Sequence, residues 1–417
     1  MPPDMKILVL TADANTLVYH RGDLIRDFAA HGCEVVTAAA EDYPHVRAFI
    51  SKLKGRHVAI RMARSAVSPL RDLVTCWDMW RLFRRERPDA LFAYTIKSVC
   101  YGAVLARLAG IPRVYSLLPG MGITFVKTES LKGRVVAGIS RFLHRVALKC
   151  SDAIFVQNAD DLNELRVQRI LPENRPAYLT AGSGVNLEEF PYVPLAKDQS
   201  LAEGRIRFAL VSRLLVSKGV RVFAQAARAL KERFPKAEFH LVGPFDPNPD
   251  RITEDEVKEW VSEGTLVHHG MVRDVAGVLE KMHVFVLPTW YREGVPHATL
   301  EALSMGRPVV TTDSVGARET VTLTSRGQLQ KRSTARIMEG HNGIMVAPRD
   351  VEAATQAMAW FLDNSHRIPT LGHASRQLAE DTFDVRGVNH IILQAMGLKG
   401  SRPRGRTLSG IPQHATV

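Results

Sequence analysis

The alternation of short apolar runs with longer helical patterns is the feature that most restricts the fold of this chain. In the first half, helical patterns such as 98–109 and 132–149 separate apolar runs at residues 6–10, 34–38, 89–94, 113–118 and 152–157. The alternation restarts with runs at 206–211, 237–242, 284–288 and 308–312. Short apolar runs between helices are typical of parallel strands that are buried on both faces. The predicted fold class is therefore α/β, with two doubly wound Rossmann-like domains.

The length of 417 residues also favours two domains, because a single hydrophobic core rarely grows beyond about 250–300 residues. We expect an N-terminal domain over residues 1–190 and a C-terminal domain over 205–380. Residues 381–396 are expected to form a helix that packs back on the N-terminal domain, and 397–417 a disordered basic tail. Open α/β sheets bind ligands at the carboxyl ends of their strands, so the expected site is a cleft between the domains.

The overall charge and the cysteines narrow the class of protein. A formal net charge of +12 favours an anionic partner, such as nucleic acid, a membrane surface or a phosphate-bearing substrate. The four cysteines show no C-x-x-C spacing, which indicates buried thiols of a reducing compartment. No segment approaches the ~20 apolar residues of a spanning helix, and the N-terminal run is too short for a signal peptide. We expect a cytoplasmic protein that is peripheral on the inner face of the cell membrane.

The segment E-G-V-P-H-A-T-L-E, residues 293–301, carries two glutamates eight positions apart. It follows an apolar strand, and its glycine and proline are typical of a tight turn that leads into a helix, which we expect from about 297 to 305. The first backbone N–H groups of such a helix bind anions. Glu293 can accept hydrogen bonds from sugar hydroxyls, and Glu301 can bind a pair of vicinal hydroxyls. The alternative is a turn residue and a solvated helix face.

A second segment, V-S-R-L-L-V-S-K-G-V at 211–220, follows the first strand of the C-terminal domain. Arg213 and Lys218 flank a short loop, and Ser217 is placed to cap the following helix. Two cations at the carboxyl end of a strand suit a diphosphate leaving group that gains negative charge. The alternative is a pair of ordinary surface cations.

Together these two segments resemble the family 4 glycosyltransferases, which are retaining enzymes of the GT-B architecture. The glutamate segment matches their E-x7-E motif and continues into G-x-P-V-V (306–310) and G-x-x-E-T (316–320). The resemblance covers most of the chain. Residues 14–24, 94–112 and 117–125 are similar to the bacterial subgroup that extends polyprenyl-diphosphate-linked sugars in N-glycan, O-antigen and capsule assembly.

The resemblance implies a donor site for a UDP-sugar, carrying an N-acetylhexosamine or a hexose. Arg213 and Lys218 would hold its diphosphate, Glu293 would contact the sugar hydroxyls and Glu301 the ribose. Glu293, Lys218 and Arg213 are the expected catalytic residues. The remaining donor-binding residues are expected to be Gly294, Val295, Pro296, His297, Ala298 and Thr299. The Pro-rich loop within 241–250 would shape the base pocket.

The N-terminal domain departs from the family. The loop in which many relatives carry a sugar-contacting histidine reads Pro119-Gly120-Met121-Gly122, and the first loop lacks two adjacent glycines. We expect a polyprenyl-diphosphate-linked sugar acceptor near Tyr19, His20, Gly120 and Gly122. For the histidine, an ordinary surface or packed role is the alternative.

Retaining transfer can proceed by two routes. The first forms a covalent intermediate with a carboxylate, for which Glu293 is the one candidate that the sequence offers. In the second, the leaving phosphate departs and the acceptor attacks on the same face of the sugar. We favour the second route, in which the protein supplies positioning and charge stabilisation. Because no D-x-D follows a strand, we expect no metal and no cofactor beyond the UDP-sugar donor.

Residues 47–87 hold eleven basic and three acidic residues, and Trp77, Trp80 and Phe83 lie among them. A second basic cluster lies within 127–149. Basic helices with aromatic side chains suit an anionic membrane surface. The alternative is an ordinary helix that packs its tryptophans into the core.

Other functions are less consistent with the residues. A hydrolase with Glu293 and Glu301 as acid and base leaves Arg213 and Lys218 without a purpose. An epimerase of the same architecture should need catalytic acids in both domains. A soluble or different lipid acceptor remains an alternative for a transferase. No aromatic-basic RNA motif and no G-x-G-x-x-G after the first strand are present, which disfavours nucleic-acid binding and a dehydrogenase. The role of the basic insertion at 321–340 is left open, as a flexible insertion near the donor or a loop of no consequence.

Overall fold

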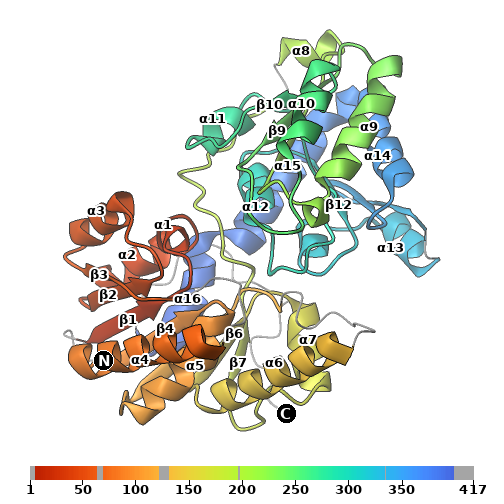
Figure 1. The fold of residues 1–417 in the computed structure, drawn as a ribbon. Coiled ribbons are helices and arrows are strands. Elements are labelled where there is room, and N and C mark those ends of the chain that lie inside the picture. Colours follow the sequence, from red (N-terminus) through yellow and green to blue (C-terminus); the bar gives the residue numbers. More distant parts are fainter. Residues whose placement is uncertain (1–4, 63–68, 122–130, 196–197, 334, 399–417) are drawn as a thin grey trace. The chain divides into compact units, whose positions relative to one another are not determined.

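The structure, a computed structural model, describes residues 5–62, 69–121, 131–195, 198–333 and 335–398. The chain forms two compact units, each built on a seven-stranded sheet (Figure 1). The first unit contains the residues up to Ser183 and those from Val385 onward, and the second contains Gly184–Asp384. The chain therefore passes from one unit to the other twice. Our expected boundaries, at residues 190 and 381, lie a few residues away from these crossings.

The sheet of the first unit has the order β3-β2-β1-β4-β5-β6-β7, and every pairing in it is parallel. Its strands are β1 (Lys6–Leu10), β2 (Glu34–Ala39), β3 (Arg56–Ala59), β4 (Ala90–Tyr94), β5 (Arg113–Leu118), β6 (Ala153–Val156) and β7 (Ala177–Leu179). The central strands are almost wholly buried, as continuous apolar runs require.

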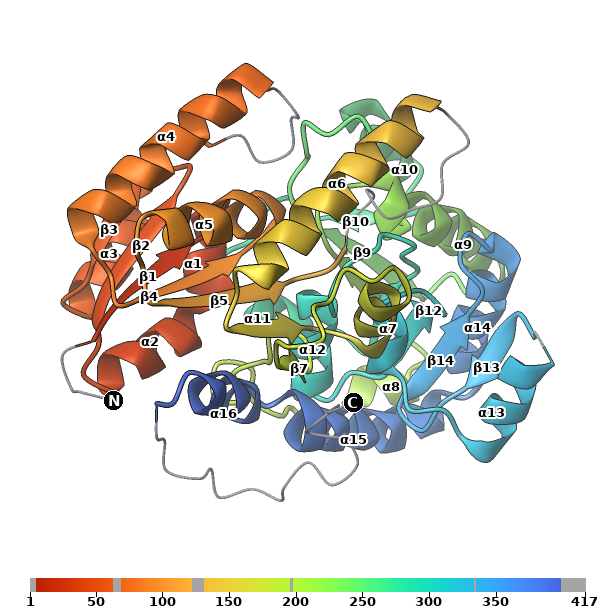
Figure 2. The ribbon, with the colours of Figure 1, turned by 90° about the horizontal axis from the view of Figure 1, so that it is seen from below.

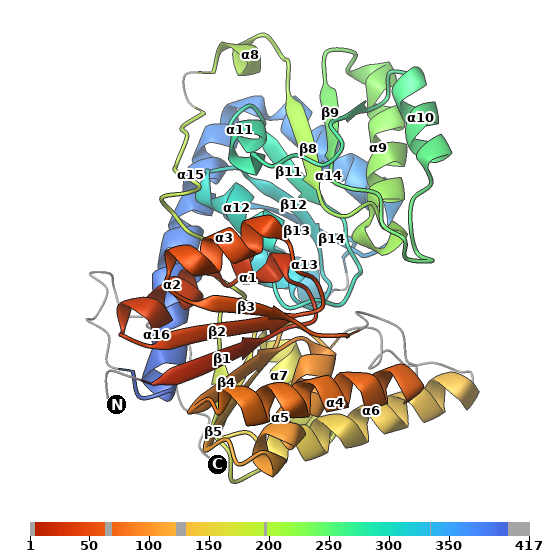
Figure 3. The same ribbon diagram turned by 60° about the vertical axis from the view of Figure 1, so that its left-hand side comes forward.

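Helices cover both faces of this sheet, and each face has its own apolar core. One core lies under α4 (Pro69–Glu86), α5 (Ile96–Leu108), α6 (Leu131–Lys149) and α7 (Ala159–Val167). The other lies under α1 (Asn15–Tyr19), α2 (Gly22–Ala30), α3 (Pro44–Lys52) and α16 (Val385–Ala395). Figures 2 and 3 show α4, α5 and α6 side by side on one face.

Helix α16 completes the first unit although it follows the second unit in the sequence. Ile392 and Leu393 are buried in the same core as β1 and α2. The Asn389 Nδ2 donates a hydrogen bond of 2.7 Å to Asp27 on α2. The amphipathic pattern of α16 thus provides an apolar face that the other helices of this unit do not supply.

The sheet of the second unit has the order β10-β9-β8-β11-β12-β14-β13, and only β13 is antiparallel to its neighbour. Its strands are β8 (Arg207–Val211), β9 (Glu238–Val242), β10 (Val267–His268), β11 (Val284–Leu287), β12 (Val309–Thr312), β13 (Ile337–Glu339) and β14 (Gly343–Val346). Its helices are α8 (Gln199–Ala202), α9 (Val220–Arg233), α10 (Glu254–Ser262), α11 (Val275–Leu279), α12 (His297–Ser304), α13 (Ser325–Arg332), α14 (Val351–Asp363) and α15 (Ile368–Leu378).

Each sheet reverses its strand order at one place, between β1 and β4 in the first unit and between β8 and β11 in the second. The connections on the two sides of such a switch point lead away to opposite faces, which leaves a crevice at the carboxyl ends of the two strands. Ligands of open α/β sheets bind at that position. The two switch points are therefore where functional residues are expected.

The structure adds elements that the apolar runs do not predict. The strands β3, β7 and β10 are short and lie at or near sheet edges. The described part of the basic insertion at 321–340 forms α13 and the edge strand β13. Among the helices that are described, none is both long and apolar enough to cross a membrane.

We predict that Ile392→Asp destabilises the first unit by several kcal/mol, because it places a carboxylate in a core position that is fully buried. Hydrogen exchange measured by mass spectrometry should show lost protection in β1 and α2 and unchanged protection in the strands of the second unit. Gln394→Asp, an exposed position on the same helix, is the control. Equal loss of protection in both units would contradict the assignment of α16 to the first.

Candidate active site

Two loops of the second unit meet at its switch point. The loop after β11 donates three hydrogen bonds to the carbonyl oxygen of Ser217, from the backbone N–H groups of Trp290 and Tyr291 (2.9 and 3.0 Å) and from the Thr289 hydroxyl (3.1 Å). Gly219 has a φ of +82°, and a Cβ there would lie 2.2 Å from the Pro288 carbonyl oxygen. Only glycine allows so close an approach, so the two loops are held as one structure.

This arrangement brings Lys218 to Glu293. The Lys218 Nζ and the Glu293 Oε1 are 2.5 Å apart, and the two side chains are only 10% and 19% exposed. The ammonium also lies 5.3 Å from the centre of the Tyr291 ring. A lysine that is paired and largely removed from water is fixed in position as a charge. The structure therefore places two of the three expected catalytic residues in contact.

The third expected catalytic residue, Arg213, lies near the same tyrosine. Its guanidinium carbon is 5.9 Å from the centre of the Tyr291 ring, and its Nη1 donates to Asp246 Oδ2 at 2.8 Å. Burial alone would lower the pKa of Arg213, but the hydrogen bond and charge of Asp246 raise it above its usual value. Arg213 is therefore a permanent cation held by Asp246, and Tyr291 lies against both cations.

The glutamate segment folds as the sequence predicts. Pro296 is the residue before the first turn of α12, and Gly306 follows the helix with a φ of +78°. Of the two backbone geometries that the sequence allows at Gly294, a tight turn or a positive φ, the positive φ is not adopted. A Cβ on Gly316 would lie 1.8 Å from the Gly294 carbonyl oxygen, so glycine at 316 lets the G-x-x-E-T turn pack directly on this loop.

The first turn of α12 presents polar groups that have unused hydrogen-bonding capacity. Thr299 is fully buried, and its hydroxyl oxygen makes no hydrogen bond to any described residue. The N-cap residue, Pro296, offers no side chain that could bond the first N–H groups of the helix. These groups suit an oxygen-rich ligand at a helix N-terminus.

Glu301, one turn further along α12, is largely buried, with 13% of its side chain exposed. Burial, with a smaller contribution from the charge of Glu189, raises the pKa of Glu301 to about 8. Its Oε1 lies 3.5 Å from the Nε2 of His297. The carboxyl group is thus held in an environment that disfavours its charge, which a hydrogen-bonding ligand would relieve.

One sequence prediction in this site is wrong. Ser217 does not cap the helix that follows it, because its hydroxyl and backbone N–H both donate to Asp250 Oδ2. Helix α9 instead begins after Gly219, whose left-handed conformation supplies the turn. The sequence analysis also did not identify Tyr291 and Asp246. Tyr291 could have been identified from the sequence because it lies only two residues before Glu293.

The expected acceptor residues lie on two loops of the first unit. Tyr19 ends α1 and is 59% exposed, and His20 follows it. The Tyr19 ring lies 6.3 Å from the His45 ring, which stacks on Tyr43. Gly120 follows β5 with a φ of +125°, and Gly122 lies outside the described residues.

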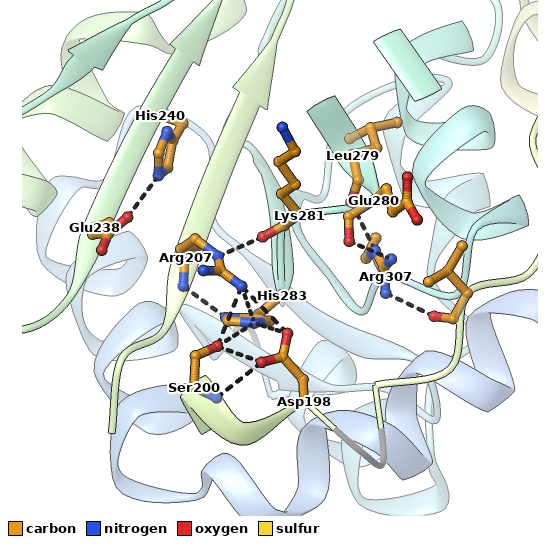
Figure 4. Close-up of polar contacts among 11 residues, drawn as sticks. Asp198, Ser200, Arg207, Glu238, His240, Leu279, Glu280, Lys281, His283 and Arg307 are labelled. Carbon is orange, nitrogen blue, oxygen red and sulfur yellow. Dashed lines mark hydrogen bonds and ion pairs between the residues drawn. The ribbon is translucent and has the colours of Figure 1, made fainter. Parts of the chain in front are cut away.

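A Ser–His–Asp cluster lies at the amino ends of β8 and β11, whereas Lys218 follows the carboxyl end of β8, and the role of the cluster is structural (Figure 4). His283 Nε2 contacts Asp198 at 2.9 Å and Ser200 Oγ at 3.3 Å. Its Nδ1 accepts the backbone N–H of Arg207 at 2.9 Å, so the ring proton is on Nε2 and is donated to Asp198. The ring therefore cannot accept a proton from Ser200, as a catalytic triad requires. The cluster anchors residues 198–200 to the amino ends of β8 and β11.

Among the described residues, no group of three or more His, Cys, Asp or Glu side chains is arranged to hold a metal ion. Lys218 and Arg213 place two side-chain cations at the carboxyl end of β8.

Comparisons with known proteins place both units in related families. Residues 205–364 match the family described as "Glycosyl transferases group 1", and residues 18–182 match the "Glycosyl transferase 4-like domain". Among solved structures, a sucrose-phosphate synthase from Thermosynechococcus elongatus is similar, with a TM-score of 0.72, 17% identity, and coverage of 94% of this chain and 98% of that chain.

Two curated bacterial proteins are also similar in sequence. One is the N,N'-diacetylbacillosaminyl-diphospho-undecaprenol alpha-1,3-N-acetylgalactosaminyltransferase of Campylobacter jejuni, 26% identical over 67% of this chain and 73% of that protein. The other is the UDP-Gal:alpha-D-GlcNAc-diphosphoundecaprenol alpha-1,3-galactosyltransferase of Escherichia coli, 26% identical over 60% of this chain and 64% of that protein.

The raised pKa of Glu301 predicts how stability depends on pH. Between pH ~4.5 and ~8 the unfolded chain releases this proton while the folded chain keeps it, so Glu301 makes unfolding easier as pH rises. We expect Glu301→Gln to increase the free energy of unfolding relative to the wild type by on the order of a few kcal/mol at pH 8 and by little at pH 4.5. Urea unfolding at a series of pH values measures this. Glu188→Gln, an exposed position, is the control, and a pH-independent difference at Glu301 would contradict the prediction.

Proposed function

The chain belongs to the family 4 glycosyltransferases of the GT-B fold, and we propose that it transfers a sugar from a UDP-sugar to a polyprenyl-diphosphate-linked saccharide with retention of configuration. The observation that carries this proposal is the ion pair of Lys218 with Glu293 beside Arg213 and Tyr291. It combines two cations for a diphosphate with a carboxylate for sugar hydroxyls at a single switch point.

The names of the two curated relatives support the lipid-linked acceptor. Both name a diphospho-undecaprenol acceptor, and both form an alpha-1,3 linkage. One name gives UDP-galactose as the donor, which supports a UDP-sugar here. An α-linked product from an α-linked donor requires retention. Surface polysaccharide or glycan assembly is the corresponding role, on the cytoplasmic side of a membrane.

In the proposed reaction, the bond from the sugar to the donor diphosphate breaks while the acceptor hydroxyl attacks from the same face. The leaving diphosphate takes up the acceptor proton, so no separate strong base is needed. Lys218 and Arg213 stabilise the negative charge that develops on the leaving group. Glu293 accepts hydrogen bonds from the sugar hydroxyls and, through its contact with Lys218, keeps the ammonium aimed at the diphosphate.

The other proposed donor contacts come from the first turns of α12 and from the loop that precedes it. Glu301 is proposed to bind the ribose hydroxyls, and the backbone N–H groups of Val295, His297 and Ala298 to bind sugar and phosphate oxygens. The buried Thr299 hydroxyl is available for a donor group. With two fixed side-chain cations at the diphosphate, we propose that turnover requires no metal ion.

A panel of UDP-sugars, offered with short-chain polyprenyl-diphosphate saccharides and read by mass spectrometry, tests the proposal directly. We expect a product with one added sugar, formed equally in the presence of EDTA. Release of free sugar without acceptor would indicate a hydrolase instead. Calorimetry that finds no uptake of UDP or of any UDP-sugar would remove the donor assignment.

We predict that Lys218→Ala and Glu293→Ala each lower kcat by about 100-fold or more, because the first removes a charge that stabilises the leaving diphosphate and the second removes a carboxylate that binds the transferred sugar. Lys236→Ala and Glu232→Ala, exposed residues near the end of α9, are the matched controls and should keep full activity. Circular dichroism and cooperative unfolding establish that each variant is folded. Full activity in a folded Lys218 or Glu293 variant would remove that residue from the mechanism.

The exposed side chains of α4 support contact with a membrane surface. Trp77 and Trp80 are 58% and 37% exposed and stack with ring centres 5.4 Å apart, so the alternative that they pack into the core is not what the structure shows. Phe83, which we expected beside them, is instead buried. Leu70, Leu73 and Val74 continue this apolar stripe along α4, and the basic residues Arg81, Arg84 and Arg85 follow it.

Helix α6 carries a similar exposed stripe. Val135, Ile139 and Phe142 are 54%, 56% and 61% exposed and recur at helical spacing. Both α4 and α6 pack against α5 on the same face of the sheet (Figure 2). We propose that these two stripes and their flanking arginines bind an anionic bilayer, where a lipid-linked acceptor is found.

Vesicle flotation tests this surface. Neutralising Arg81, Arg84 and Arg85 together, each to Gln, should weaken binding to anionic vesicles by about 100-fold or more, at ~1 kcal/mol per cation. The control is the triple Gln variant of Arg228, Arg233 and Arg326, which removes the same charge from exposed positions of the second unit. Equal weakening in both variants would show that net charge, and not the surface of α4, determines binding.

A further inference from the structure

Arg21 is a buried cation that the proposed reaction does not yet use. It lies between α1 and α2, is 2% exposed, and precedes the first turn of α2. Its Nε and Nη1 atoms are buried and make no hydrogen bond. Among the described residues, no carboxylate forms an ion pair with it. Its one recorded side-chain contact is with the Tyr94 ring, whose centre lies 5.7 Å from the guanidinium carbon.

An unpaired guanidinium in the protein interior is energetically unfavourable. Burial lowers the pKa of Arg21 to about 10, and the only group near it that acts in the other direction is Tyr94. The Tyr94 hydroxyl is itself engaged, at 2.9 Å from the Thr16 hydroxyl. Buried charges in folded proteins are normally paired or bound to a ligand. The first unit therefore holds a cation that no described residue satisfies.

The position of Arg21 in the fold is that of a binding site. Tyr94 is the last residue of β4, and Thr11, which contacts Thr16, directly follows β1. These two strands flank the switch point of the first sheet, where ligands of open α/β sheets bind. Thr95 at the same edge has a φ of +76°, which is strained for a β-branched residue and is held by hydrogen bonds with Ala12 and Ser98.

We propose that Arg21 binds a phosphate of the diphosphate that links the acceptor to its lipid. The identity of the ligand rests on the proposed function. The existence of an anion site rests on three observations: Arg21 is buried, it has no acidic partner among the described residues, and it lies at the switch point. A planar guanidinium with free N–H groups matches two phosphate oxygens. The residues Tyr19 and His20, immediately before it in the chain, are exposed and lie where the rest of the acceptor would approach.

The donor also carries a diphosphate, so the experiment must separate the two sources. Farnesyl diphosphate is the probe, because it carries the diphosphate and a short polyprenyl chain without a nucleotide. Its binding is measured by calorimetry in the presence of saturating UDP, which occupies the site at Lys218 and Arg213. UDP affinity is measured separately on the same proteins.

We expect Arg21→Met to weaken the binding of farnesyl diphosphate by 10-fold or more and to leave UDP affinity within two-fold of the wild type. Arg21→Lys should retain part of the affinity. Without ligand, Arg21→Met should unfold at the same or a higher temperature than the wild type, because it removes a buried charge that has no partner. If Arg21 were purely structural, Arg21→Met would lower the unfolding temperature and would not selectively weaken the binding of farnesyl diphosphate.

The control is Arg26→Met. Arg26 lies on α2 five residues away, is exposed, and forms an ion pair with Asp23 at 2.6 Å. It should bind farnesyl diphosphate as the wild type does. Lower thermal stability of Arg21→Met with unchanged farnesyl diphosphate binding would overturn the inference, as would a loss confined to UDP. Failure of sugar transfer with all acceptors, with farnesyl diphosphate binding still dependent on Arg21, would contradict the proposed function but not the anion site.

Discussion

The three hydrogen bonds that converge on the Ser217 carbonyl oxygen are the constraint on which the candidate active site depends. They fix the loop after β11 against the loop after β8, and so bring Glu293 to Lys218, which lie 75 residues apart in the chain. Without them, the ammonium and the carboxylate would be on two independent loops. With them, the charges are in place before a substrate arrives, which is what electrostatic catalysis requires.

Basic side chains lie at both switch points, but they differ in whether they have an acidic partner. In the second unit, the cations Lys218 and Arg213 each form an ion pair with an acidic side chain. In the first unit, Arg21 has an aromatic ring beside it and no acidic partner among the described residues. The charges of the second unit are therefore positioned without a ligand, whereas the role proposed for Arg21 leaves its charge to be neutralised when an anion binds.

The sequence predicted the fold and part of the site, and the limits have physical reasons. Central strands were found because burial on both faces makes them continuous apolar runs, whereas β3 has two exposed residues and β10 is only two residues long. Glu293 and Lys218 could be selected as candidates because motif spacing marks them, and the structure brings them into contact. Arg21, Asp246 and Tyr291 were missed because their significance lies in burial and long-range contacts, which spacing along the chain does not reveal. The exposure of Trp77 and Trp80 likewise depends on which face of α4 meets the sheet.

The return of α16 to the first unit has a consequence for biosynthesis. The second unit is continuous from Gly184 to Asp384, whereas the core of the first needs Ile392 and Leu393. On the ribosome, the first unit emerges first but lacks part of its core until α16 has been made, after the whole of the second unit. The second unit begins later in the sequence, but all of its residues are present once Asp384 has been made. The order of completion during translation is thus the reverse of the order along the sequence, and nascent chains expose an unfinished apolar face that chaperones can bind.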